Sequence, residues 1–148
     1  MKNKTLYVIV LFILGMTSCQ QHNSDVVFHK SHEPKKAEAP YSDVVAANGF
    51  LFLSGQIGMD HSIRVLVEGG IEAETKQSIE NIKAVLAQHN SSLDKVVKCT
   101  VILKDISDFA KFNAIYKTYF PNKPARTTFA ASGLAAGAQI EIDVIALK

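Results

Sequence analysis

Short runs of apolar or alternating residues recur along the chain from residue 26 onward and predict β-strands. The runs at 43–47 and 50–54 are separated by Asn48-Gly49. This pair favours a hairpin, because both central positions of a two-residue turn need a positive φ. Further strands are predicted at 96–103, 126–131 and 139–147, with a short first strand near 26–29.

Two segments carry apolar residues at helical spacing. The first is predicted to form a helix over 71–90, where Ile71, Ile79 and Leu86 share a face. The second begins near Ser107 and ends at Phe120, because Pro121 cannot continue a helix. Its aromatic stripe is expected to lie in the core and consists of Phe109, Phe112, Tyr116 and Tyr119.

The element order β-β-β-α-β-α-β-β places the chain in the α/β class. Strand-helix-strand units imply parallel strands, whereas the hairpin implies an antiparallel part. The prediction is one mixed β-sheet with both helices on one face. Apolar residues on the other face would need a partner, so an oligomer is expected.

The N-terminus resembles a bacterial lipoprotein signal. Lys2 and Lys4 precede the apolar run 6–16, which is too short to cross a bilayer and ends shortly before Cys19. Residues 1–18 are therefore expected to be removed and Cys19 to carry lipid, which predicts an exported protein anchored to a bacterial membrane and facing the periplasm. An uncleaved anchor and a plain secretory signal are the alternatives.

Residues 19–40 then form a polar tether with a possible strand near 26–29, and 41–148 form the domain. Removing residues 1–18 takes away two of the 16 basic residues and none of the 14 acidic ones, so the net charge falls from +2 to zero. A neutral domain lacks the basic surface typical of nucleic-acid binding. Only two arginines are present, Arg64 and Arg126. Cys99, in an alternating strand, is expected to be a buried, unpaired thiol.

No metal site or cofactor is expected. The five histidines are scattered, and the only close pair, His29 and His32, lies in the tether. Gly69-Gly70 lacks the lysine and further glycine of a phosphate-binding loop. Ser54-Gly55 ends a strand but lacks the sequence of a serine-nucleophile turn.

Two charged residues on the last two strands are candidates for chemistry. Alternation places Arg126 on one face with Thr128, and Glu141 on one face with Asp143. Arginine can hold a carboxylate through two parallel hydrogen bonds, and a shielded glutamate can act as a base toward water. An ordinary salt bridge between neighbouring strands, or two solvated charges, explains the same pattern.

Several segments also match a known family in combination: 39–41 (APY), 52–57 (FLSGQI), 75–85 (TKQSIENIKAV), 97–109 (VKCTVILKDISDF), 113–116 (NAIY), 120–126 with its Phe-Pro and Pro-Ala-Arg, and 140–142 (IEI). Together they resemble the RidA (YjgF-type) family of reactive enamine/imine deaminases, over nearly everything from residue 26 to 148. The resemblance implies a chorismate-mutase-like fold and a homotrimer whose sheets form a central barrel, with clefts between subunits.

The resemblance also implies roles for individual residues. Arg126 would bind the substrate carboxylate and Glu141 would position the attacking water. The residues that would line the cleft are Tyr41, Ser54, Gly55 and Asn113, together with Thr128, which stands where the family often has cysteine. Each has a structural alternative: Tyr41 can pack the sheet edge, Ser54-Gly55 can end a strand, and Asn113 can brace its helix.

The function implied is hydrolysis of 2-imino acids, or their enamine tautomers, to 2-keto acids and ammonia. The ligand would be a small imino or keto acid, and contact with the membrane would be through the lipid anchor alone. The main alternative is a non-catalytic, membrane-tethered trimeric module that binds small carboxylates. Ribonuclease activity is a third possibility, against which the zero net charge argues.

Overall fold

A computed structural model describes residues 25–148, and Cys19 and the predicted signal lie outside that range. The strands are β1 (Val27–His29), β2 (Val44–Ala47), β3 (Phe50–Leu53), β4 (Gln56–Ile57), β5 (Met59–Asp60), β6 (Val65–Leu66), β7 (Val96–Leu103), β8 (Ala125–Ala130) and β9 (Ile140–Leu147). The helices are α2 (Gly70–Gln88) and α3 (Phe109–Tyr119), with short 3-10 turns at Pro34–Lys36, Leu93–Lys95, Ile106–Asp108 and Ala135–Gly137. No helix within residues 25–148 is long and apolar enough to span a bilayer.

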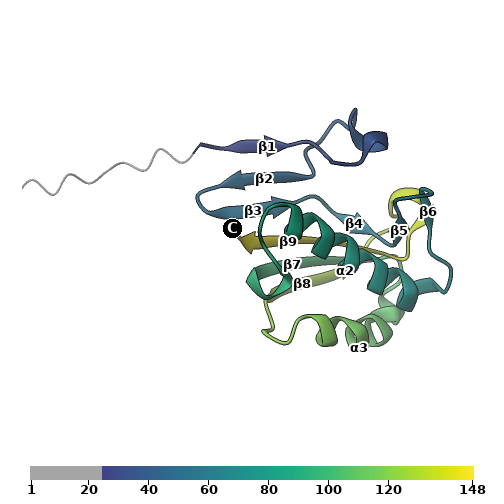
Figure 1. Ribbon diagram of the computed structural model, residues 1–148. Coiled ribbons are helices and arrows are strands. Elements are labelled where there is room, and N and C mark those ends of the chain that lie inside the picture. The colour runs from purple at the N-terminus through teal and green to yellow at the C-terminus, as the bar shows by residue number, and fades with distance from the viewer. Residues whose placement is uncertain (1–24) are drawn as a thin grey trace, which may run out of the picture.

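The main sheet has the order β1-β2-β3-β9-β7-β8, and β4 also pairs with β9 (Figure 1). Only β7 and β8 pair in parallel, while the other neighbours are antiparallel. Helices α2 and α3 lie on the same face of this sheet. The predicted fold class, a mixed sheet with two helices on one face, is therefore confirmed. Strand β1 forms one edge of the sheet and β8 the other.

The hairpin predicted at Asn48-Gly49 joins β2 to β3, and both residues have the expected positive φ, 52° and 79°. The core lies between the sheet and the helices and includes Ile79, Leu86 and Ile142. Helix α3 contributes Phe112 and Tyr116, with Tyr119 packed at the margin. The prediction that Phe109 lies in the core is wrong: its side chain is 38% exposed.

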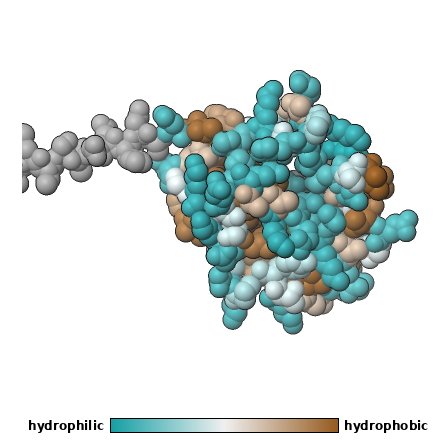
Figure 2. All heavy atoms as spheres, in the orientation of Figure 1, coloured by the Kyte–Doolittle hydropathy of each residue, from teal (hydrophilic) through white to brown (hydrophobic). Residues whose placement is uncertain are grey.

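The sheet face away from the helices is uncovered in the single chain. Alternate residues of its strands point there, including exposed apolar side chains from four strands: Phe28, Phe50, Phe52, Phe129 and Leu147. The helix side, in contrast, is largely hydrophilic, with apolar residues near its margin around β5 and β6 (Figure 2). Large exposed apolar patches mark interaction surfaces in soluble proteins.

Residues 30–40 pack against the domain, although their composition suggests a loose connection. Lys36 contacts both Glu33 and Asp43, at 3.5 and 4.0 Å. The region 56–66, where the sequence pattern predicts no strand or helix, contains β4 and the β5–β6 hairpin. Strands of two residues carry too little alternation to be recognised in a sequence.

Candidate functional site

A cavity of about 430 Å³ lies between β4, the β5–β6 hairpin, the 3-10 turn near Ala136 and the segment before β2. Glu141, the second residue of β9, lines it together with Tyr41, Ser54 and Gly55. Four of the residues expected to form the site are thus brought together. The volume is within the range usual for small-molecule sites.

Gly55 lies directly against the Glu141 carboxyl group. A Cβ atom at Gly55 would lie 2.0 Å from Glu141 Oε1 and 2.8 Å from its Cδ, so no larger residue fits without moving Glu141. Burial, and secondarily the Asp143 carboxylate on the same face, raise the pKa of Glu141 above its ordinary value. A carboxylate with a raised pKa in a cavity is suited to accept a proton from water.

Tyr41 and Ser54 are held differently within this wall. The Ser54 hydroxyl donates a hydrogen bond to the Ser42 carbonyl (2.6 Å), and the Ser54 backbone N–H donates to the Asp43 carbonyl (2.9 Å). These bonds support the expectation that Ser54-Gly55 shapes the end of a strand as well as the cavity. The Tyr41 side chain is 55% exposed, so it does not pack the sheet edge tightly.

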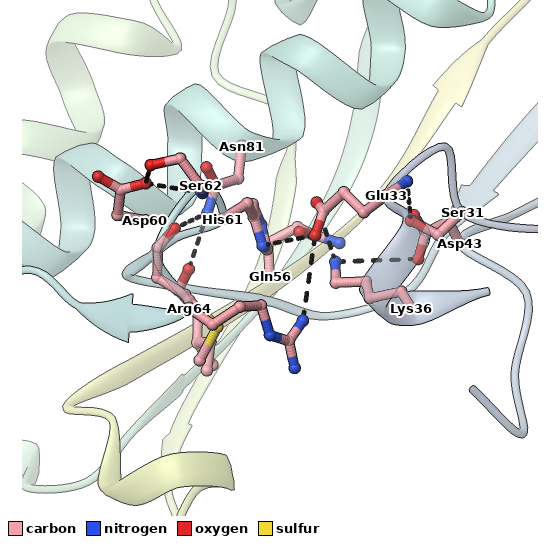
Figure 3. A network of polar contacts seen from close by, with 12 residues as sticks. Ser31, Glu33, Lys36, Asp43, Gln56, Asp60, His61, Ser62, Arg64 and Asn81 are labelled. Carbon is pink, nitrogen blue, oxygen red and sulfur yellow. Dashed lines mark hydrogen bonds and ion pairs between the residues drawn. The ribbon is translucent and has the colours of Figure 1, made fainter. Parts of the chain in front are cut away.

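Basic residues that the sequence reasoning did not place in the site also line the cavity: Lys36, His61 and Arg64. They surround the Glu33 carboxylate (Figure 3), at 3.5 Å from Lys36 Nζ, 3.0 Å from His61 Nδ1 and 4.0 Å from Arg64 Nη1. Burial and the nearby Lys36 ammonium lower the pKa of His61. The scarcity of arginine was the one sequence signal for Arg64.

Arg126 is part of a second cluster. Its Nη1 donates a hydrogen bond to Asn113 Oδ1 (2.9 Å). Its guanidinium carbon lies 4.5 Å from the centre of the Tyr116 ring and 5.1 Å from that of Phe112. No carboxylate among residues 25–148 forms an ion pair with it. Cation–π contacts and Asn113 therefore fix the group and leave most of its N–H donors available.

Thr128 lies on the same face as Arg126, as expected from alternation. Its hydroxyl oxygen is buried and has no hydrogen-bond partner among the described residues. Cys99 pairs with Arg126 in the β7–β8 register and is a buried free thiol, as expected. Burial raises the pKa of that thiol to about 11.

The two clusters lie on opposite faces of the sheet. Arg126 is in register with Cys99, which faces the helices, whereas Glu141 is in register with Ile102, which does not. Strand β7 also separates their strands. The alternative of a salt bridge between neighbouring strands is therefore wrong, because one chain does not bring these two side chains together.

Within residues 25–148 no group of three or more His, Cys, Asp or Glu side chains is arranged to hold a metal ion. The charged residues that line the cavity in the described part are Glu141, Lys36, His61 and Arg64, whereas Arg126 lies in the second cluster.

A family model described as endoribonuclease L-PSP matches residues 30–148. The chain belongs to this family, also known as the RidA family. It is 42% identical over 125 residues to a RutC family protein of Pyrococcus abyssi, covering 84% of this chain and 97% of that protein. It is also 42% identical over 113 residues to human 2-iminobutanoate/2-iminopropanoate deaminase, covering 76% of this chain and 82% of that one.

Solved structures of RidA-family proteins share the fold. RidA from an Antarctic Psychrobacter has a TM-score of 0.72 at 33% identity, covering 81% of this chain and 94% of that chain. Escherichia coli TdcF, solved with bound serine, has a TM-score of 0.69 at 28% identity, covering 74% and 88% of the two chains. The family match, over residues 30–148, includes the residues of both clusters.

Proposed function

We propose that this protein hydrolyses reactive 2-imino acids, and their enamine tautomers, to 2-keto acids and ammonia. The observation that carries the proposal is the Glu141 carboxyl group, partly shielded from water and with a raised pKa, in a cavity large enough for such a substrate. The family membership and the names of the mammalian relatives support it.

The reaction needs positioning and proton transfer. Arg126 holds the substrate carboxylate, and Glu141 removes a proton from a water molecule as its oxygen adds to the imine carbon. Glu141 returns this proton to the nitrogen, which gives a carbinolamine. Glu141 then transfers the carbinolamine hydroxyl proton to the same nitrogen, so that ammonia leaves as the C=O bond forms. Water supplies the oxygen of the keto acid, and no electron is gained or lost.

Because Arg126 and Glu141 lie on opposite faces, we propose that each site combines Glu141 of one copy with Arg126 of a neighbouring copy in a homotrimer. Arg126 is on the edge strand β8, where another chain can approach. The exposed apolar residues on the uncovered sheet face supply a surface for the same assembly.

The first experiment measures keto-acid formation from freshly generated 2-aminoacrylate. Arg126→Ala, Glu141→Ala and the isosteric Glu141→Gln are each expected to lose most of the activity while the oligomer, measured by sedimentation, stays intact. Undiminished turnover in any of these variants would contradict the mechanism.

A mixing experiment tests the shared site. Arg126→Ala and Glu141→Gln chains are unfolded together in equal amounts and refolded. If each site takes one residue from each of two copies, random mixing restores both groups in about one quarter of the sites. Activity near that level is expected, whereas a mixture as inactive as its components would place each site within one chain.

A non-catalytic carboxylate-binding module is the competing function. Calorimetry with 2-oxobutanoate on the same sample distinguishes it, because binding without turnover by the wild type favours the module.

We also propose that the chain is exported and anchored through lipid on Cys19. Incorporation of labelled palmitate in a bacterial host, lost in Cys19→Ala, is the expected result. Equal labelling of both chains would exclude this residue as the lipidation site.

A further inference from the structure

The cavity that contains Glu141 has a basic wall that the proposed reaction does not use. Arg64 and Lys36 line it, and Glu141 is the only acidic residue among residues 25–148 that does so. In the proposed reaction the substrate carboxylate binds Arg126, which belongs to the other cluster. The basic wall is thus available to a different part of a ligand.

Arg64 occupies a backbone position that does not favour arginine. It ends the loop between β5 and β6, where its N–H donates to the Asp60 carbonyl (2.8 Å), and its φ is 63°. This left-handed conformation costs an L-residue about 1–2 kcal/mol, whereas glycine adopts it freely. Backbone strain of this kind is found preferentially at functional sites.

The contact between Arg64 and Glu33 does not account for this choice of residue. The two side chains approach only to 4.0 Å, and both are partly exposed, at 36% and 28%. Such pairs are worth about 0–1 kcal/mol, which is less than the backbone strain. A further interaction of the guanidinium would explain why arginine stands at this position.

The guanidinium of Arg64 is also more available to a ligand than the ammonium group of Lys36. Lys36 has two carboxylates within 4.0 Å, those of Glu33 and Asp43. Arg64 has only Glu33 among the described residues, shared with Lys36 and His61, and its guanidinium makes no hydrogen bond there. Figure 3 shows its end reaching toward Glu33 from the β5–β6 loop. An arginine with open donors suits a carboxylate.

We propose that Arg64 binds a second, distal carboxylate of the substrate, so that the preferred substrates are 2-imino dicarboxylates with four or five carbons. This inference rests on the proposed function and names the substrate class of that site. The distal carboxylate does not react: water replaces the imine nitrogen, and the products are a 2-keto dicarboxylate and ammonia.

The test compares two imines made in place by flavin-dependent amino-acid oxidases with catalase present. One derives from D-aspartate or D-glutamate, and the other from 2-aminobutyrate. The wild-type chain is expected to hydrolyse the dicarboxylic imine with a kcat/KM at least about tenfold higher. In Arg64→Gly the ratio of the two kcat/KM values should fall about 10- to 100-fold, as expected for loss of a charged hydrogen-bonding pair.

Two further variants refine the result. Arg64→Lys should give an intermediate ratio, because lysine keeps the charge but not the bidentate geometry. Lys83→Gln, which removes an exposed lysine of α2, controls for the change in net charge and should leave the ratio unaltered. Arg64→Gly should fold, because glycine suits the positive φ, and its thermal unfolding checks this.

A wild-type preference for the neutral imine, or equal losses on both substrates in Arg64→Gly, would overturn the inference while leaving the deaminase function standing. If the wild type hydrolyses neither imine, the proposed function fails. Calorimetry then decides the ligand class by itself. Tighter binding of 2-oxoglutarate than of 2-oxobutanoate, lost in Arg64→Gly, supports the inference, and equal affinities exclude it.

Discussion

Replacing Gly55 by alanine tests directly whether the position of the Glu141 carboxyl group determines activity. The new Cβ would lie 2.0 Å from Glu141 Oε1, 2.8 Å from Cδ and 2.9 Å from Cγ. An ordinary contact needs about 3.4 Å or more, so the carboxylate oxygen must move by roughly 1.4 Å. The positive-φ glycines do not include Gly55, so its backbone tolerates alanine.

The expected loss of stability is small and the loss of activity large. Rotating one partly exposed side chain away from its preferred conformation costs about 1 kcal/mol, so the melting temperature should fall by only a few degrees. A displacement of about 1 Å between reacting groups can lower the rate about 100-fold, and kcat for imine hydrolysis should fall to that extent.

Gly133→Ala is the matched control. It makes the same chemical change at a glycine where a Cβ meets nothing within 4 Å and where φ is not positive. Its kcat and melting temperature should equal those of the wild type. If Gly55→Ala folds and retains kcat within twofold of the wild type, the placement of Glu141 against Gly55 does not matter for the reaction.

Three further outcomes are expected. The acidic midpoint of the pH profile of kcat/KM should lie above the ordinary glutamate pKa, because Glu141 must be ionised and its pKa is raised. Asp143→Asn should lower this midpoint only in part, since burial is the larger cause of the raised pKa. In a Cys19→Ser chain, Cys99 should resist iodoacetamide at pH 8 until the protein unfolds, because burial raises the pKa of its thiol to about 11, and rapid native labelling would contradict its burial. Phe52→Asp on the uncovered sheet face should shift the oligomer toward monomer in sedimentation and lower activity with it, and an unchanged oligomer would show that this residue lies outside the interface.

Most of the fold could be predicted because its signals are local. Asn48-Gly49 predicts a hairpin because both residues tolerate a positive φ. Pro121, which cannot continue a helix, predicts the end of α3. The β5–β6 hairpin could not be predicted, because each of its strands has only two residues. Its loop also ends on Arg64 at a positive φ, where glycine or asparagine is the usual sequence signal of a hairpin turn.

The grouping of the site residues was harder to predict. Alternation correctly predicted that Arg126 shares a face with Thr128 and that Glu141 shares a face with Asp143. Whether these two faces are on the same side of the sheet depends on β7, which lies between β8 and β9. Strand insertion is a long-range property that spacing does not encode. The contact of Lys36 and His61 with Glu33 likewise depends on tertiary packing of residues 30–40.

The position of β1 at the edge of the sheet opposite β8 has a consequence for evolution. The chain enters the domain five strands away from Arg126 in the sheet order, so the segment before residue 27 can change in length or sequence without reshaping that strand. The localisation of the protein and the chemistry of its domain can then change independently of each other. A different leader sequence joined at this edge could direct the same domain to another compartment in a single genetic step.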